Sequence, residues 1–249
     1  TMLLAIITVL ALTFMGTGVR EDISVLPASQ PPLLTSLRAI LGYRTFWTIA
    51  VASGLYSGGM ALVVAAVQFY VKYTLGRPSE ESTFLLVAVI LTSVLCLIGW
   101  TALVRRYTAL PMWRLALGIL AAALAALWFA TSLVMAIVVG CLVGLGYSGV
   151  MATLDLIVAR LLDEDTARTG VHRESMFLAA FSFFNHTTGL MQSAAFGLAA
   201  TVYGFRSGDD PGAHPGEAAR FLVSGFPVIL VLGALAVSLT VRFRPAPAP

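Results

Sequence analysis

Long apolar runs separated by short polar segments dominate this sequence. Six of the runs are long enough to cross a bilayer, at approximately 46–71, 83–104, 113–131, 133–158, 176–203 and 219–241. A hydrocarbon core of about 30 Å needs roughly 20 residues of helix to cross it. Backbone amides in lipid must also find their partners within the segment, which makes each run a helix. The pattern therefore predicts an all-α membrane protein with six full spans.

The remaining segments complete this organisation. The opening run LLAIITVLALTF is too short for a full span and lacks the flanks of a signal peptide. We interpret 1–16 as the end of a truncated spanning helix, so that the chain would be a fragment. Segment 17–45 is a proline-containing linker whose leucines and arginines predict an amphipathic surface helix. Residues 46–241 would form the six-helix bundle, followed by a tail at 242–249.

The composition excludes several classes of function. The chain has 249 residues, of which 59% are hydrophobic and 11% charged, with a net charge of +3. A soluble domain carries about 25% charged residues. No basic run is long enough to follow a phosphate backbone, so we expect no nucleic-acid partner. Cys96 and Cys141 lie in apolar runs without metal-ligand spacing, so neither a disulfide nor a metal or other cofactor is expected. The chain also lacks GxSxG, HExxH and P-loop patterns, which disfavours an enzyme.

Successive connections between the predicted spans lie on alternate sides of the membrane, and the basic residues are distributed unequally between these two sets of connections. One set of connections holds Arg20, Arg38, Arg44, Arg105, Arg106, Arg114, Arg160, Arg168, Arg173, Arg242 and Arg244. The other set holds only Lys72, Arg77, Arg206 and Arg220. By the positive-inside rule, the linker, the 160–174 segment and the C-terminus face the cytoplasm of a plasma or inner membrane.

One ionisable residue lies deep within a predicted span. If that helix enters the hydrocarbon near Met176, His186 lies about 15 Å deep, close to the midplane. Ionisable residues at such a depth are by default candidates for function, although a packing hydrogen bond is the alternative. Ser182 shares the small, polar face of His186, whereas Phe177 and Phe181 mark a bulky face that we expect to contact lipid.

Four weaker candidates could line the same substrate or coupling pathway. They are Asn185 and Gln192 on the fifth full span, and Tyr56 and Gln68 on the first. Each could instead bond to a neighbouring helix. Asp155, near the cytoplasmic end of the fourth span, is more simply interpreted as a carboxylate that reaches the interface than as an ion ligand.

The charged segment 160–174 resembles the loop between the tenth and eleventh helices of the glycoside–pentoside–hexuronide:cation symporter family (melibiose-permease-like), a branch of the major facilitator superfamily. The resemblance is carried by Asp163, Glu164, Asp165, Arg168, Thr169, Gly170, Arg173 and Glu174. GLGYSG (144–149), GWTALVRRY (99–107) and YRTFW (43–47) resemble its tenth helix, the end of its eighth and the entry to its seventh. The arginine at 173 falls one position late, and Arg160 stands where the family often has aspartate.

The resemblance implies the carboxy-terminal six-helix half of a transporter that works by alternating access. The cytoplasmic gate would then comprise Asp163, Asp165, Arg168, Gly170, Arg173 and Glu174, since charged pairs near water form and break easily. His186 occupies a position that is commonly lysine in the family and belongs to its substrate and cation pathway. Histidine keeps a titratable group there, with an ordinary pKa of about 6.5.

The expected function is symport of sugars or glycosides, coupled to Na⁺ or H⁺. The coupling cation should bind to carboxylates in the missing amino-terminal half. The expected partners of this chain are that half, membrane lipid and a small-molecule substrate. A symporter of lysophospholipids or other amphiphiles is the alternative within the superfamily, because this half offers few sugar-binding groups. A non-transporting membrane scaffold or receptor is the alternative from a different class.

Overall fold

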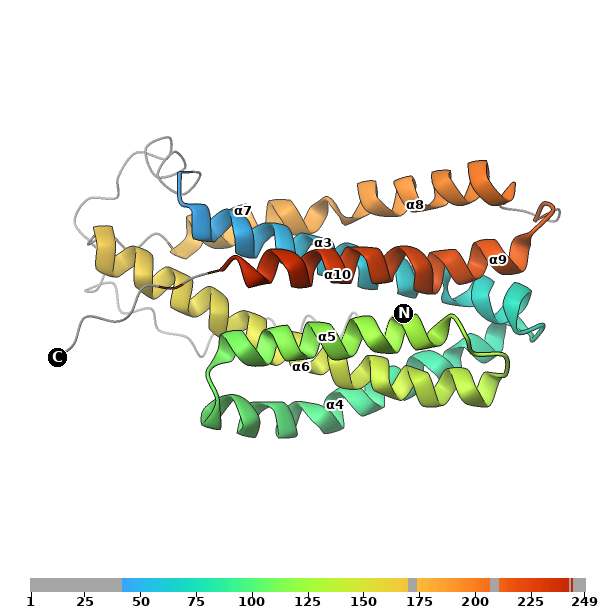
Figure 1. Cartoon of the computed structure of the whole chain (residues 1–249), viewed down its shortest axis with the longest axis horizontal. Coiled ribbons are helices and arrows are strands. Elements are labelled where there is room, and N and C mark those ends of the chain that lie inside the picture. The colour runs from blue at the N-terminus through green and yellow to red at the C-terminus, as the bar shows by residue number, and fades with distance from the viewer. Residues whose placement is uncertain (1–41, 170–173, 207–210, 242, 244–249) are drawn as a thin grey trace, which may run out of the picture. The chain divides into compact units, whose positions relative to one another are not determined.

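The computed structural model describes residues 42–169, 174–206, 211–241 and 243, and every regular element within them is helical (Figure 1). The α-helices are α3 (Arg44–Phe69), α4 (Ser82–Arg106), α5 (Ala109–Leu127), α6 (Leu133–Thr169), α7 (Glu174–His186), α8 (Thr188–Tyr203), α9 (Pro215–Arg220) and α10 (Phe226–Leu239). Shorter helical turns are η2 (Tyr70–Thr74), η3 (Ser79–Glu81) and η4 (Phe221–Gly225). The predicted all-α class is confirmed.

Five helical stretches among the described residues are long and apolar enough to cross a membrane. They are Arg44–Thr74, Ser79–Arg106, Ala109–Leu127, Leu133–Ala167 and Pro215–Leu239. These stretches correspond to five of the six predicted spans. The sixth, predicted as one helix over 176–203, is divided at Thr187 into α7 and α8. The amide and the hydroxyl of Thr187 both donate to the carbonyl of Phe184, at 3.1 and 2.6 Å, so the regular helical ladder stops there.

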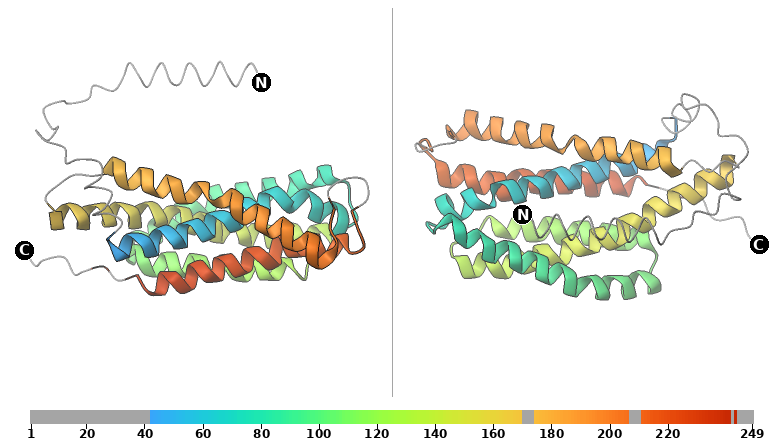
Figure 2. Two further views of the ribbon diagram at one scale, coloured as in Figure 1. Left: turned by 90° about the horizontal axis from the view of Figure 1, so that it is seen from above. Right: turned by 180° about the vertical axis from the view of Figure 1, so that it is seen from behind.

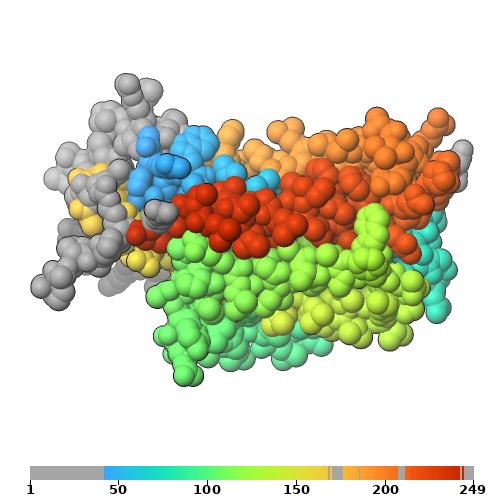
Figure 3. Space-filling view, in the orientation of Figure 1, coloured from blue at the N-terminus to red at the C-terminus, as the bar shows by residue number. Residues whose placement is uncertain are grey.

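The spanning helices pack in a simple order. Helix α6 lies between α4 and α5, while α10 packs along both α3 and α5. Figure 3 shows the side chains of α10 and α5 meeting along their length. Helices α7 and α8 follow α3 (Figure 2). Helix α3 therefore joins the pair α7–α8 to the rest of the described bundle.

Glycines bring α6 close to both of its neighbours. A Cβ atom at Gly144 would lie 2.5 Å from the carbonyl oxygen of Val89 on α4, and one at Gly146 would lie 2.7 Å from the Cα of Leu120 on α5. Neither position has room for a side chain. The hydroxyl of Ser93 donates to the carbonyl of Gly144 across the same contact, at 3.1 Å. The close approach fixes the position of α6 relative to α4 and α5.

Side chains satisfy carbonyl groups at two helix ends. The hydroxyl of Tyr70 lies 3.0 Å from the carbonyl oxygen of Leu127, at the end of α5. Arg114 donates from Nη2 to the carbonyls of Ser238 and Val241, at 2.9 and 3.2 Å, where α10 ends. The last carbonyls of a helix lack partners within it, so these contacts close both ends.

Candidate functional site

A cavity of about 700 Å³ opens between α3, α4 and α6. The described residues that line it are Tyr56, Ser57, Met60, Ala61, Val64, Leu86, Val89, Ile90, Ser93, Val94, Tyr147 and Met151. Most of these side chains are aliphatic or thioether, and the polar groups belong to two tyrosines and two serines. Its volume is that of a typical small-molecule site, and its mixture of apolar walls with a few polar groups is also typical of one. We call it the tyrosine cavity.

Tyr56 and Tyr147 form the aromatic part of this cavity. Their ring centroids lie 6.1 Å apart, with the ring planes inclined by 30°. Tyr56 is only 3% exposed, and its buried hydroxyl makes no well-formed hydrogen bond to the described residues, although it interacts with the hydroxyl of Tyr147. A buried hydroxyl without a partner costs about 1–3 kcal/mol. A bound molecule would remove this penalty if the Tyr56 ring turned its shielded oxygen into the cavity.

The two serines of the tyrosine cavity add little hydrogen-bonding capacity for a ligand. The hydroxyl of Ser93 lies 2.7 Å from the carbonyl of Val89 on its own helix and 3.1 Å from that of Gly144 on α6, so it serves helix packing. Ser57 is half-buried and has an interaction of its own. The capacity of this cavity for several simultaneous hydrogen bonds to a polyol is therefore small.

A second cavity, of about 380 Å³, lies between α3, α6 and α7. Its described lining is Ser53, Leu154, Asp155, Val158, Ala159, Leu162, Leu178, Phe181 and Ser182. Ser53 precedes Tyr56 on α3 by three residues, and Met151 of the tyrosine cavity precedes Asp155 by four. The two cavities are therefore about one helical turn apart along both helices. We call the second one the aspartate cavity.

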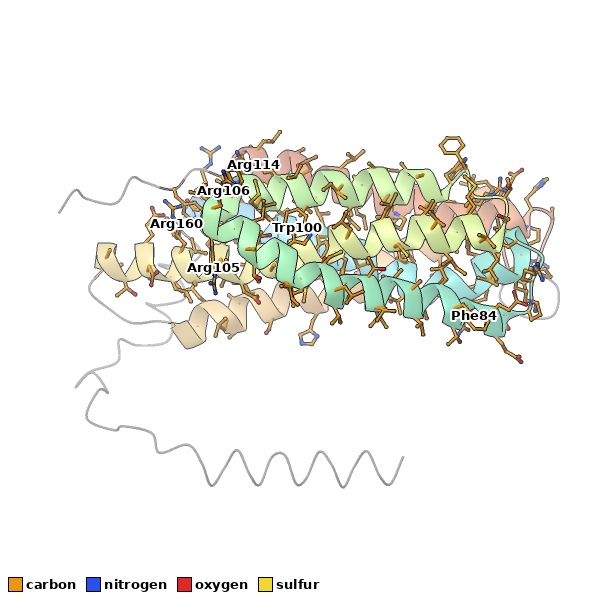
Figure 4. All side chains as sticks on the ribbon, turned by 90° about the horizontal axis from the view of Figure 1, so that it is seen from below. Phe84, Trp100, Arg105, Arg106, Arg114 and Arg160 are labelled. Carbon is orange, nitrogen blue, oxygen red and sulfur yellow. The ribbon has the colours of Figure 1, made fainter. Side chains whose placement is uncertain are left out.

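Asp155 lines the second cavity, and its interpretation as a carboxylate that reaches the membrane interface stays a prediction. It is exposed, and it faces the aspartate cavity together with Ser53 and Ser182. Arg160 lies five residues further along α6, which is about 7.5 Å of helix rise. Figure 4 shows Arg160, Arg105, Arg106 and Arg114 gathered at one end of the helices, here called the basic end, and Phe84 towards the other. Asp155 therefore lies inward of the basic end, and it was the carboxylate that sequence reasoning set aside.

His186 ends α7 and is exposed, directly before the interruption at Thr187. A Cβ atom at Gly54 would lie 3.7 Å from the carbonyl oxygen of Phe184, so this part of α7 is level with the middle of α3 near Tyr56. Interrupted helices are tolerated in membranes where they line a cavity or are buried in protein. Ser182, one turn earlier on the same face, lines the aspartate cavity.

The bulky face of α7 does not point away from the protein. Phe177 is fully buried and Phe181 is 6% exposed. Both pack edge-on against Phe46 of α3, with ring centroids 5.7 and 5.2 Å apart. The expectation that this face contacts lipid is therefore wrong for these two residues. Edge-to-face contacts between aromatic rings are favourable, and α7 makes them with Phe46 of α3.

The other pathway candidates are scattered. Gln68 is exposed on α3, one turn beyond Val64 of the tyrosine cavity, and continues that face. Gln192 is half-buried on α8. The side chain of Asn185 is outside the described residues. The structure thus places Tyr56 and Ser182 at the two cavities, and the proposed roles of all six candidates remain predictions.

The predicted gate segment is largely helical. Helix α6 continues to Thr169, so 160–169 is not a loop as expected. Asp163 is exposed and Asp165 is only 3% exposed. The described residues do not include segment 170–173, which contains the gate residues Gly170 and Arg173. The side chains of Arg168 and Glu174 are also outside them. Strong helix formers follow the apolar part of α6, which allows the helix to extend beyond the predicted span.

Apolar helices of spanning length, with cavities between them, define a multi-pass membrane protein. A family model described as MFS/sugar transport protein matches residues 1–244. The chain therefore belongs to this family of the major facilitator superfamily. No curated protein matches the chain. The match does not distinguish the glycoside–pentoside–hexuronide:cation symporter branch, which remains our prediction.

Proposed function

We propose that this chain is the carboxy-terminal half of a secondary active transporter. Such transporters bind their substrate between two halves and expose it to each side of the membrane in turn. The observation that carries the proposal is the tyrosine cavity itself, about 700 Å³ between three spanning helices, with the rings of Tyr56 and Tyr147 in its wall. A non-transporting scaffold has no need for a cavity of this size between its spanning helices.

The lining of the tyrosine cavity favours a substrate with a large apolar part. Met60, Ile90, Val94 and Met151 contribute thioether and aliphatic surface, and Ser93 is already bonded to backbone carbonyls. A symporter of amphiphiles is thus the first candidate. Symport of sugars or glycosides is the second, supported by the family description and by the aromatic pair, on which a sugar ring could stack.

The proposed orientation places the basic end at the cytoplasm of a plasma or inner membrane. The arginines of α4, α5 and α6 lie at that end (Figure 4), which fits the positive-inside rule. The segment after α6 would form the cytoplasmic gate, with Asp163 on α6 and Arg173 beyond it making reversible contacts. The coupling ion, Na⁺ or H⁺, would bind to carboxylates of the amino-terminal half. These assignments come from the resemblance and the charge distribution.

The test is substrate exchange by the complete transporter in proteoliposomes. Vesicles loaded with phenyl β-glucoside or with phenethyltrimethylammonium would be assayed for counterflow of the labelled compound. We expect exchange above that of empty vesicles, reduced at least tenfold by Tyr147→Ala. Tyr107→Ala is the matched control, because Tyr107 is exposed at the end of α4 and outside both cavities. Equal effects of the two substitutions, or no exchange of either compound, would contradict the proposal.

A further inference from the structure

The two cavities together indicate the charge of the substrate, an inference that rests on the proposed function. We propose that the substrate is an organic cation with an apolar or aromatic body. Its positive group would lie at Asp155 in the aspartate cavity, and its body would lie against Tyr56 and Tyr147 in the tyrosine cavity.

The first argument is that the walls leave Asp155 uncompensated. Its carboxylate makes no ion pair or hydrogen bond with any residue that the structure describes. The described linings of both cavities also contain no lysine, arginine or histidine. Leu154, Val158, Leu162 and Phe181 form the apolar part of the same lining, in which Asp155 itself is exposed. A cationic group that enters this cavity would therefore meet a carboxylate with no competing cation in the described lining.

The second argument is the spacing of the two sites. Along α6, Asp155 follows Met151 of the tyrosine cavity by about 6 Å of helix rise. Along α3, Tyr56 follows Ser53 of the aspartate cavity by about 4.5 Å. A ligand whose charged group is separated from an aromatic or aliphatic body by two or three bonds would therefore reach both cavities at once.

The third argument is the polarity of each cavity. Among the described residues, the lining of the aspartate cavity has one carboxylate and the hydroxyl groups of Ser53 and Ser182, whereas that of the tyrosine cavity is mostly hydrocarbon with two aromatic rings. An amphiphilic cation matches this division, since its head meets the carboxylate and its body meets the apolar walls. The electron-rich faces of Tyr56 and Tyr147 also attract a cation that lies between the cavities. A neutral sugar needs hydrogen-bonding groups along its whole length, and the tyrosine cavity has few.

The experiment measures binding to the complete transporter in lipid nanodiscs. The probes are phenethyltrimethylammonium and phenyl β-glucoside, which share an aromatic ring but differ in charge. We expect the cation to bind at least tenfold more tightly than the glucoside. Asp155→Asn should weaken binding of the cation at least tenfold, and Asp155→Glu should retain most of it. Glu80→Gln is the charge-matched control, because Glu80 is exposed on η3, outside both cavities.

The outcomes separate this inference from the proposed function. If the glucoside binds more tightly and Tyr147→Ala weakens it, while Asp155→Asn changes nothing, the inference is wrong and the proposed function stands. If Asp155→Asn removes a dependence on Na⁺ or pH but leaves the affinity for the organic cation intact, Asp155 serves the coupling ion and the inference is wrong. If neither probe binds and neither is exchanged, both proposals fail.

Discussion

The rings of Tyr56 and Tyr147 lie 6.1 Å apart where α3 and α6 face the same cavity. One ring is nearly buried, and the other is half-buried. The pair joins two helices that otherwise touch little, since α3 packs mainly on α10 and α8, and α6 on α4 and α5. An aromatic contact at such a place holds the two helices together while it leaves the space beside the rings open.

Removal of the Tyr56 hydroxyl should separate stability from function. In Tyr56→Phe the buried unsatisfied group disappears, so thermal stability should remain unchanged or rise by up to about 1–3 kcal/mol. The affinity for substrate should fall about tenfold, which is the value of one hydrogen bond. Melting curves in detergent and equilibrium binding test both parts. A variant that melts lower and binds normally would show that the hydroxyl serves structure alone.

Bulk at Gly146 should destabilise the contact of α6 with α5. A side chain there meets the backbone of Leu120, so we expect Gly146→Val to lower the free energy of unfolding by about 1–3 kcal/mol or more. Gly118→Ala is the control, because a Cβ atom at Gly118 meets nothing within 4 Å. That variant should be neutral or slightly stabilising, as alanine favours helix. Similar melting temperatures of the two variants would contradict the close packing of α6.

Loss of the Arg114 guanidinium should loosen the end of α10. Arg114 donates to the carbonyls of Ser238 and Val241, and both would lose this partner in Arg114→Met. We expect a loss of about 1–3 kcal/mol in thermal unfolding. Arg105→Met removes an exposed charge at the end of α4 and should change little. Hydrogen exchange at the last turn of α10 would localise the effect.

His186 should matter for transport rather than for stability. It is exposed at the interruption between α7 and α8, so His186→Ala removes little packing. We expect slower exchange of substrate, because an imidazole that can hydrogen-bond to substrate is lost from the interruption. Initial rates of exchange in proteoliposomes, measured at more than one pH, provide the test. Rates that match the unmodified transporter at every pH would remove His186 from the pathway.

The positions of the spans could be predicted because the hydrophobic pattern sets them directly. Helix α6 was predicted to end near 158, since only apolar residues were counted, yet the polar segment that follows is also a good helix former and continues to Thr169. The interruption between α7 and α8 at Thr187 leaves no trace in the hydrophobic pattern. A single threonine is common within spanning helices, and the same hydroxyl bond to the carbonyl three residues earlier is made by Ser148 within the uninterrupted α6.

The candidate site was only partly accessible to sequence reasoning. The sequence indicates Tyr56 and Ser182 as pathway candidates, and both line cavities. The predicted orientation of α7 was wrong because bulky apolar residues pack equally well on lipid or on another helix. The sequence does not reveal that Phe46 of α3 lies where it can contact this face. That Asp155 lines a cavity could not be predicted, because this depends on how α3 and α7 pack beside α6.

The tyrosine cavity should belong to a water-accessible substrate path. Its most direct test is labelling of single cysteines in a transporter freed of Cys96 and Cys141. Val94→Cys lines the cavity, and Ile229→Cys lies exposed on α10, outside both cavities. A membrane-impermeant thiol reagent should modify the cysteine at 94 from either side, more slowly when substrate is present, and should not modify the one at 229. Equal inertness of both cysteines to this reagent, with labelling only by a lipid-soluble maleimide, would contradict the claim.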